Sequence, residues 1–293
     1  MLLATRRLGL VAFAWLIFQA SHATANACWK ELHFAASNSW VAATTVIQYQ
    51  TMATATAVAE LQGATALPVL PATSSAIGKI HVTFSAARSQ GELDTWFDPG
   101  NGAVLQSLRT TQGRDRRQKL YRFASDGVWR ERREPAPASG WIPTNSRQIA
   151  YPVTISTDDP VITPLMLIDH AARLVRDAQT NSSTHLVFTD TQLYRVTLEL
   201  GPEQNLAAKF TLVEDGRETP MNESRAARRV SINAQLLGTE PEQDRFSLLE
   251  LSGELAIDID VRTAIPLRIQ GSTYLGVVPV AITKAVLERN CQP

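Results

Sequence analysis

Two aspartates near the end of the chain form the best candidate pair for acid–base chemistry. Asp258 and Asp260 alternate with apolar residues in the segment ELAIDIDVR. Residues i and i+2 of a strand point to the same face, with Cα atoms about 6.5–7 Å apart. Paired carboxylates of this kind can hydrolyse a glycoside. The alternative is a solvated sheet face on which Arg262 neutralises Asp260, with no catalytic role for either aspartate.

The most strongly charged run, GRDRRQKLYRF at residues 113–123, is a candidate anion site. A strand beginning near its middle places Tyr121 and Arg122 on opposite faces, and cross-strand neighbours bring Arg122 near Arg109 or Arg130. Guanidinium groups suit phosphate or carboxylate, so these four residues are a candidate site for an anionic lipid headgroup at the rim of an apolar groove. The alternative is a charged hairpin, neutralised by nearby acids, that protects a sheet edge.

The remaining residues that could do chemistry are scattered. The sequence holds no glycine-rich phosphate loop, no Gly-x-Ser-x-Gly elbow and no His-Glu-x-x-His helix. Its histidines show no metal-ligand spacing, and we expect neither a metal site nor a cofactor. His170 falls on the polar flank of an amphipathic segment, so we expect its ring to be exposed.

The first residues have the pattern of an export signal. Arg6 and Arg7 precede an apolar run, residues 8–20, and small residues then offer cleavage near Ala25 or Ala27. A retained membrane anchor is the alternative, but the apolar run is shorter than the ~20 residues that a bilayer needs. We therefore expect residues 1–25 to be a signal peptide, with a periplasmic or secreted mature chain that contains no transmembrane span.

Charge excludes one class of partner. The chain carries 28 basic and 28 acidic residues, and loss of Arg6 and Arg7 leaves 26 basic residues. A dedicated nucleic-acid-binding protein normally has a net basic surface, so we expect no nucleic-acid partner.

The two cysteines, Cys28 and Cys291, stand at opposite ends of the mature chain. An exported compartment permits a disulfide between them, worth about 5 kcal/mol in the loop-entropy model. Lipidation of Cys28 and a pair of reduced thiols are the alternatives.

The pattern of strands and turns predicts a mainly β fold. Residues 77–293 contain short alternating runs separated by turns such as Asp98-Pro99-Gly100-Asn101-Gly102, which is typical of an antiparallel meander. Residues 26–76, rich in Ala, Thr and Ser, are poorly defined strands with a loop, and residues 135–146 are expected to be a loop. We predict a curved antiparallel sheet or partial barrel.

One amphipathic helix is predicted at residues 164–177. Thr163-Pro164 offers an N-cap followed by proline at the first helical position, and apolar residues then recur with a period of 3.6. We expect the helix to pack its apolar face on the concave side of the sheet.

Two segments resemble a family of exported bacterial proteins of unknown function. The meander DPGNGAVLQSLRTTQGRDRRQKLYRFASDGV resembles the family's central hairpins, and AIDIDVRTAIPLRIQGSTYLGVVPVAITKAVL resembles its closing strands. The closing motif falls on Asp260, Arg262, Ile265, Pro266, Arg268 and Gly276, and the resemblance covers residues 77–288. It implies a curved antiparallel half-barrel similar to the periplasmic lipoprotein carriers, and it implies no catalytic residues.

These observations together predict an exported, non-catalytic binding protein of the cell envelope. A lipophilic or anionic-lipid ligand is expected between the concave sheet and the helix, with a lipophilic small molecule or an envelope protein as partner. A glycan hydrolase that uses Asp258 and Asp260, and an envelope scaffold protein, are the alternatives.

Overall fold

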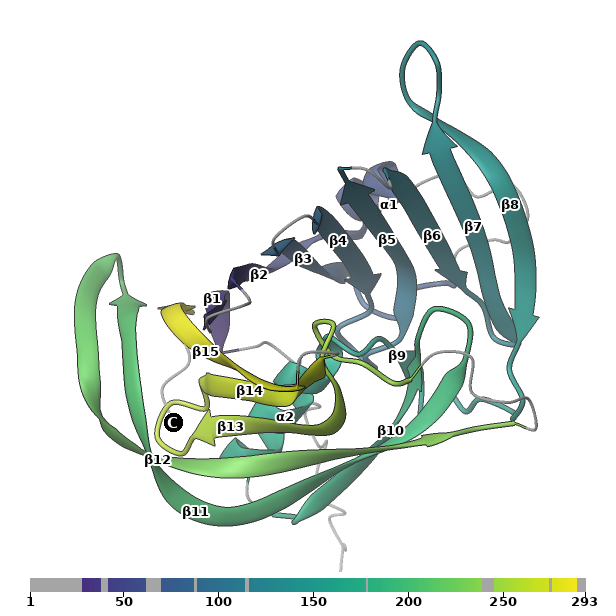
Figure 1. The fold of residues 1–293 in the computed structure, drawn as a ribbon. Coiled ribbons are helices and arrows are strands. Elements are labelled where there is room, and N and C mark those ends of the chain that lie inside the picture. The colour runs from purple at the N-terminus through teal and green to yellow at the C-terminus, as the bar shows by residue number, and fades with distance from the viewer. Residues whose placement is uncertain are drawn as a thin grey trace, which may run out of the picture.

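The computed structural model describes residues 28–37, 42–61, 70–86, 89–113, 116–177, 179–238, 245–273 and 276–288. They form a mainly β fold with one large curved sheet, which confirms the predicted fold class (Figure 1). The strands are β1 (Trp29–Ser37), β2 (Ala42–Ala53), β3 (Ala76–Ala86), β4 (Ser89–Phe97), β5 (Val104–Gln112), β6 (Arg117–Phe123), β7 (Gly127–Pro135), β8 (Trp141–Ala150), β9 (Val161–Ile162), β10 (Ser182–Phe188), β11 (Leu193–Glu214), β12 (Arg217–Leu236), β13 (Ser252–Asp260), β14 (Pro266–Thr273) and β15 (Gly276–Leu287). The helices are α1 (Thr54–Glu60) and α2 (Met166–Asp177).

The sheet is two antiparallel meanders joined at its centre, with β9 added in parallel beside β10 at one end. Its strand order is β8-β7-β6-β5-β4-β3-β2-β1-β15-β14-β13-β12-β11-β10-β9. The first strand therefore pairs with the last strand as well as with β2, so the N-terminal region predicted as poorly defined lies in the middle of the sheet. The sheet curves round until its β8 end approaches β9 and β10 (Figure 1).

The two faces of the sheet pack against different helices. The inner face, as we name it, carries the main core, and it packs with the seven buried residues of α2. Over β3–β6 the outer face carries a smaller core of Ile77, Trp96, Leu105, Leu108 and Leu120, in which Ala57 of α1 is also buried. This alternation follows from the period of two in a strand.

Helix α2 has the predicted apolar face. The backbone N–H of Met166 donates to the carbonyl of Thr163, so the first turn begins where the sequence offers a cap. The helix contacts β13 and β11, and its buried residues are Met166, Leu167, Ile168, Ala171, Ala172, Leu174 and Val175. None of the helices in the described ranges is long and apolar enough to span a bilayer.

Strands β11 to β15 also close on themselves. Each pairs with the next, and residues 211–213 of β11 pair in parallel with residues 284–286 of β15. The β11–β12 hairpin is long enough to reach back because β11 continues through Gly201-Pro202, where its register with β12 shifts. A glycine followed by a proline usually marks a break in a strand, and here it marks only the register shift.

One predicted loop is a strand. Residues 141–146 belong to β8, although Pro143 and the preceding glycine favoured a loop. β8 is the last strand at its end of the sheet, where a proline need not donate to a further neighbour. The register shift between Arg132 and Arg133 lies opposite this proline.

Candidate functional site

A block of basic side chains lies on the inner face of β5–β8. Residues opposite each other in neighbouring strands share a face. The row that runs Leu32, Ile47, Val82 and Leu93 across β1–β4 therefore continues as Arg109, Lys119 and Arg132. The basic block consists of Arg109, Arg117, Lys119, Arg130, Arg132 and Arg147. The inner face thus changes from apolar to cationic within one sheet.

One acid from the other end of the sheet enters this block. Asp190 lies in the turn between β10 and β11, and its carboxylate accepts hydrogen bonds from Lys119 Nζ at 2.5 Å and Arg130 Nε at 3.3 Å. The hydroxyl of Tyr121 also donates to it. We name this contact between β6–β7 and the β10–β11 turn the seam.

The seam is partly withdrawn from water, and this shifts its proton equilibria. Burial raises the pKa of Asp190. Hydrogen bonds from Lys119 and Tyr121 lower this pKa by more than burial raises it, so the pKa lies below its ordinary value. Burial lowers the pKa of Lys119, with nearby arginines adding to that effect. Burial and the adjacent carboxylate raise the pKa of Tyr121, so the phenol stays protonated as a donor.

Aromatic side chains surround the same contact. Phe188, at the end of β10, lies 5.9 Å from Phe123 and 6.4 Å from both Tyr121 and Tyr151, measured between ring centroids. These edge-to-face arrangements are the favoured ones for aromatic pairs. The seam therefore combines cations, one phenol and an apolar aromatic cluster, a set that suits a molecule with an anionic head and an apolar body.

The predicted site residues divide between the two faces. Tyr121 and Arg130 meet at Asp190, and Arg109 pairs with Glu250 at 2.6 Å on the same face. Arg122 is not with them, because it lies on the outer face, 4% exposed, and donates to Gln106 at 2.7 Å. Its position follows from the alternation already expected within β6.

The charged β6–β7 hairpin is less exposed to solvent than we would expect if its charges only protected a sheet edge. The side chains of Lys119 and Arg130 are 17% and 15% exposed. Glu131, one of the acids expected to neutralise the arginines, pairs with Arg133 at 2.5 Å on the outer face. Glu134, a second nearby acid, does pair with Arg132 of the basic block at 3.1 Å. Asp190 and Glu250, which pair with Lys119, Arg130 and Arg109, come from distant parts of the chain.

Asp258, the first of the two candidate catalytic aspartates, is saturated with partners. It is 1% exposed and accepts hydrogen bonds from Gln204 at 2.9 Å, Arg229 at 3.0 Å and Arg268 at 2.7 Å. Two guanidinium groups thus hold one carboxylate across neighbouring strands, as β-sheet cross-strand pairs do.

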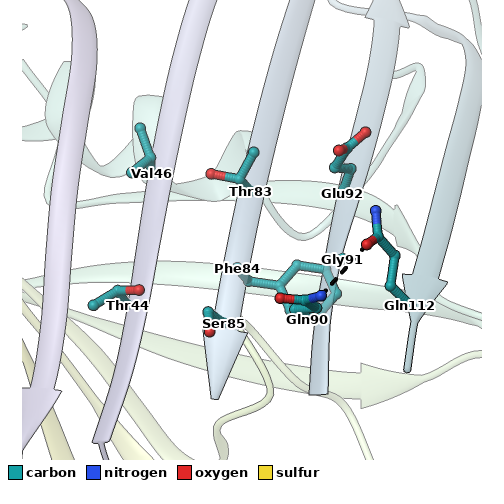
Figure 2. A pocket seen from close by; sticks show the side chains of 9 residues that line it. All are labelled: Thr44, Val46, Thr83, Phe84, Ser85, Gln90, Gly91, Glu92 and Gln112. Carbon is teal, nitrogen blue, oxygen red and sulfur yellow. Dashed lines mark hydrogen bonds between the residues drawn. The ribbon is translucent and has the colours of Figure 1, made fainter. Parts of the chain in front are cut away.

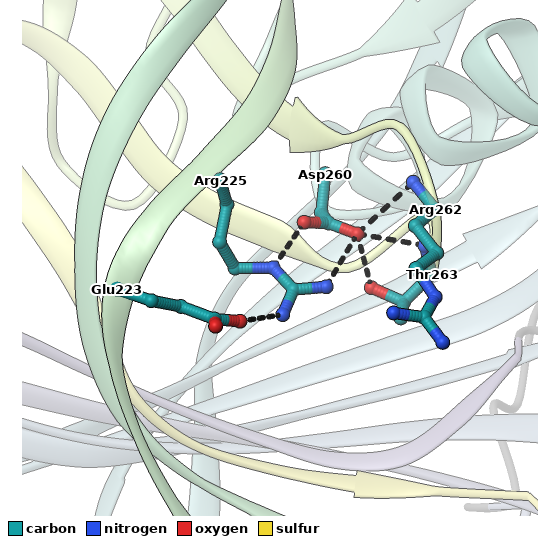
Figure 3. A network of polar contacts seen from close by, with 5 residues as sticks. All are labelled: Glu223, Arg225, Asp260, Arg262 and Thr263. Atoms are coloured by element: carbon teal, nitrogen blue, oxygen red, sulfur yellow. Dashed lines mark hydrogen bonds and ion pairs between the residues drawn. The ribbon is translucent and has the colours of Figure 1, made fainter.

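Asp260 is held in the same way, and Figure 3 shows its network. It is 1% exposed, and the guanidinium of Arg225 binds both of its oxygens. Thr263 donates to it twice at 2.7 Å, through its backbone N–H and its hydroxyl. The expected partner Arg262 contributes its backbone N–H at 3.1 Å, so Arg225 supplies the neutralising charge, on a buried face.

A half-buried pair of histidines was not expected. The rings of His170 in α2 and His185 in β10 lie 4.1 Å apart, and His185 Nε2 is 3.0 Å from the hydroxyl of Ser183. Burial lowers the pKa of His170 well below its ordinary value and lowers the pKa of His185 to about 4, and Arg173 adds to both effects. The exposed position predicted for His170 is wrong, because the ring of His185 from β10 lies against it.

Two open hollows lie elsewhere on the sheet. One of about 300 Å³ is lined by Thr44, Val46, Thr83, Phe84, Ser85, Gln90, Gly91, Glu92 and Gln112 (Figure 2). The other, of about 570 Å³, is lined by Lys30, Glu31, Gln48, Tyr49, Gln50, Lys79, His81 and Val286. Both hollows are open to solvent, and their linings mix polar and apolar surface.

The thiol of Cys28 is free and accepts a contact from Arg176 Nη1 at 3.1 Å. Cys291 lies outside the described residues, as does the predicted signal peptide, so the bridge and the signal stay predictions. Among the residues that the structure describes, no group of three or more His, Cys, Asp or Glu side chains is arranged to hold a metal ion.

The seam residues that were not among the predicted site residues are Lys119, Phe188 and Asp190. Asp190 is separated from Tyr121 by 69 positions, and no local pattern connects them. Comparison with known proteins found no matching family model, no similar curated protein and no similar solved structure.

Proposed function

We propose that this chain is an exported, non-catalytic binding protein of the cell envelope that holds an amphiphile with an anionic head. The head binds the basic block at Lys119 and Arg130, and Arg109 lies beside them. The apolar body extends from the aromatic cluster along the inner face toward α2. The export signal at residues 1–25, and a disulfide between Cys28 and Cys291, belong to the same proposal.

The observation that carries this proposal is the change of character along one face. The inner face is apolar over β1–β4 and cationic over β5–β8, with aromatic rings between the seam and the core. Guanidinium and ammonium groups that are partly withdrawn from water bind phosphate or carboxylate more strongly than exposed ones do. A lipid-like anion matches both parts at once.

The two aspartates support a role without catalysis. A general acid or base must reach the proton that it transfers. Asp258 and Asp260 are each 1% exposed, and arginines occupy their oxygens. These pairs have the arrangement of a structural network, so the hydrolase alternative has less support than the binding protein.

The test is native mass spectrometry of mature protein purified from an exported pool, followed by solvent extraction of any bound mass. We expect a reproducible lipid-sized adduct that carries a phosphate or carboxylate group. A clean ligand-free mass in a protein shown to be folded, and still free after incubation with phosphatidylglycerol, would contradict the proposal. The same spectrum with and without reductant reports the bridge, because a disulfide removes two hydrogens.

A further inference from the structure

The two ends of the large sheet meet through side chains. β8 and β9 are its terminal strands, and in the described part of the chain no strand pairing joins them. The side-chain contacts across this gap include those of Asp190, the rings around Phe188, and the pair Arg109–Glu250. Side-chain contacts of this kind separate far more readily than a ladder of backbone hydrogen bonds.

Asp190 is placed as a bound carboxylate ligand would be. Its two oxygens receive an ammonium, a guanidinium and a phenolic hydroxyl, all from the inner face of β6–β7. One negative charge faces two positive charges here, and Arg117 also acts on Lys119 electrostatically. The basic block therefore keeps an excess of positive charge when Asp190 is bound.

We propose that Asp190 occupies the site of the ligand's anionic group, and that a phosphate- or carboxylate-headed ligand displaces it and releases the β10–β11 turn from the sheet. This inference rests on the proposed function. The displaced turn carries Phe188 away with it, since that ring directly precedes the turn. Entry of the apolar body and departure of Asp190 are then the same event.

The competition has a measurable consequence for affinity. A ligand anion must replace the charge-assisted hydrogen bonds of Asp190 before it gains its own. Asp190→Asn keeps the size of the side chain and removes its charge, so we expect it to bind the anion roughly tenfold more tightly or better. Asp158→Asn, at an exposed position in the segment before β9, is the matched control and should leave affinity unchanged.

The experiment uses three probes on the full mature chain. Short-chain phosphatidylglycerol below its micelle concentration tests the anionic amphiphile, short-chain phosphatidylcholine tests the apolar body alone, and inorganic phosphate tests the anion alone. Calorimetry gives each affinity for wild type, Asp190→Asn and Asp158→Asn. Tighter binding of phosphate alone by Asp190→Asn would also support displacement, and would identify a free anion rather than a lipid head as the ligand.

Hydrogen exchange gives a second readout that does not depend on the variant folding well. In wild type, amides of β6 and of the β10–β11 turn should exchange faster when phosphatidylglycerol is bound, whereas an ordinary ligand slows exchange. In ligand-free Asp190→Asn the same amides should already exchange faster. Unchanged affinity together with unchanged exchange at these amides would overturn the inference.

The two proposals fail in different ways. If no probe binds to any form, but Asp190→Asn still loosens the seam, the proposed function is wrong and Asp190 remains the closing contact. If wild type binds phosphatidylglycerol but Asp190→Asn alters neither affinity nor exchange, the proposed function stands and the displacement is wrong.

Discussion

At the scale of single residues, the seam depends on the bond that the Tyr121 hydroxyl donates to Asp190. Tyr121→Phe removes this donor to a partly buried charge, and we expect a loss of about 1–2 kcal/mol in the free energy of unfolding, measured by denaturant titration. Tyr151→Phe is the control, because the buried Tyr151 hydroxyl has no hydrogen-bond partner among the residues that the structure describes. Equal losses in the two variants would contradict the role given to Asp190.

The buried ion pair between Asp260 and Arg225 leads to a second prediction, which concerns stability. Asp260→Asn leaves the guanidinium of Arg225, 8% exposed, without its buried partner, and we expect a loss of about 3 kcal/mol in unfolding free energy. Glu223 is the other acid that pairs with Arg225, and its side chain is 53% exposed. Glu223→Gln should therefore lower the free energy of unfolding by less than about 0.5 kcal/mol. Wild-type stability in Asp260→Asn would show that this aspartate is not a structural charge and would revive the catalytic reading.

At the scale of elements, the histidine pair makes the packing of α2 on β10 sensitive to acid. Burial lowers the pKa of both rings in the folded chain, so the unfolded chain binds more protons below its ordinary histidine pKa of 6.5. Stability is therefore complete above about pH 6.5 and falls as the pH drops toward about 4, where His185 titrates. The contribution of His185 is at most about 3 kcal/mol.

The check is thermal or denaturant unfolding of wild type and His185→Gln between pH 4 and 7. His185→Gln should lose part of the slope, and the comparison isolates this ring from Asp169 and Arg173, which pair beside it in α2. His81→Gln is the control, because His81 pairs with Asp94 on another part of the sheet. A slope that is identical in wild type and His185→Gln would contradict the half-buried pair.

Helices and strands with a clear hydrophobic periodicity were predictable from the sequence. The elements against which they pack were not. The 3.6 period and the Thr163-Pro164 cap predicted α2, and alternation predicted the meander. The sequence missed β8, because Pro143 reads as a break unless the strand is known to lie at an edge. It also placed His170 in solvent, because the helix period cannot show that His185 from a distant strand lies against that ring.

The candidate site was predictable only in part, for the same reason. Alternation within β6 correctly separates Tyr121 from Arg122, and the face shared by Tyr121 and Arg130 follows from the strand register. The contact with Asp190 depends on how the whole sheet curves. It also depends on the pairing of β1 with β15, which joins the two halves of the sheet and which no local pattern predicts.

At the scale of the whole molecule, the two ends of the sheet meet at a seam that is cationic and lined by aromatic rings. Arg130→Gln should weaken the binding of an anionic amphiphile at least tenfold, because one charge-assisted bond to the head is lost. Arg217→Gln, at the exposed start of β12, changes the net charge equally and should leave binding unchanged.

The most direct single measurement is the affinity of the purified mature chain for short-chain phosphatidylglycerol and phosphatidylcholine, determined by calorimetry for wild type, Arg130→Gln and Arg217→Gln. The account predicts that wild type and Arg217→Gln prefer phosphatidylglycerol and that Arg130→Gln loses this preference. Binding of neither lipid by a folded protein, or equal binding of both lipids by all three forms, would contradict the central claim that the basic block holds an anionic head.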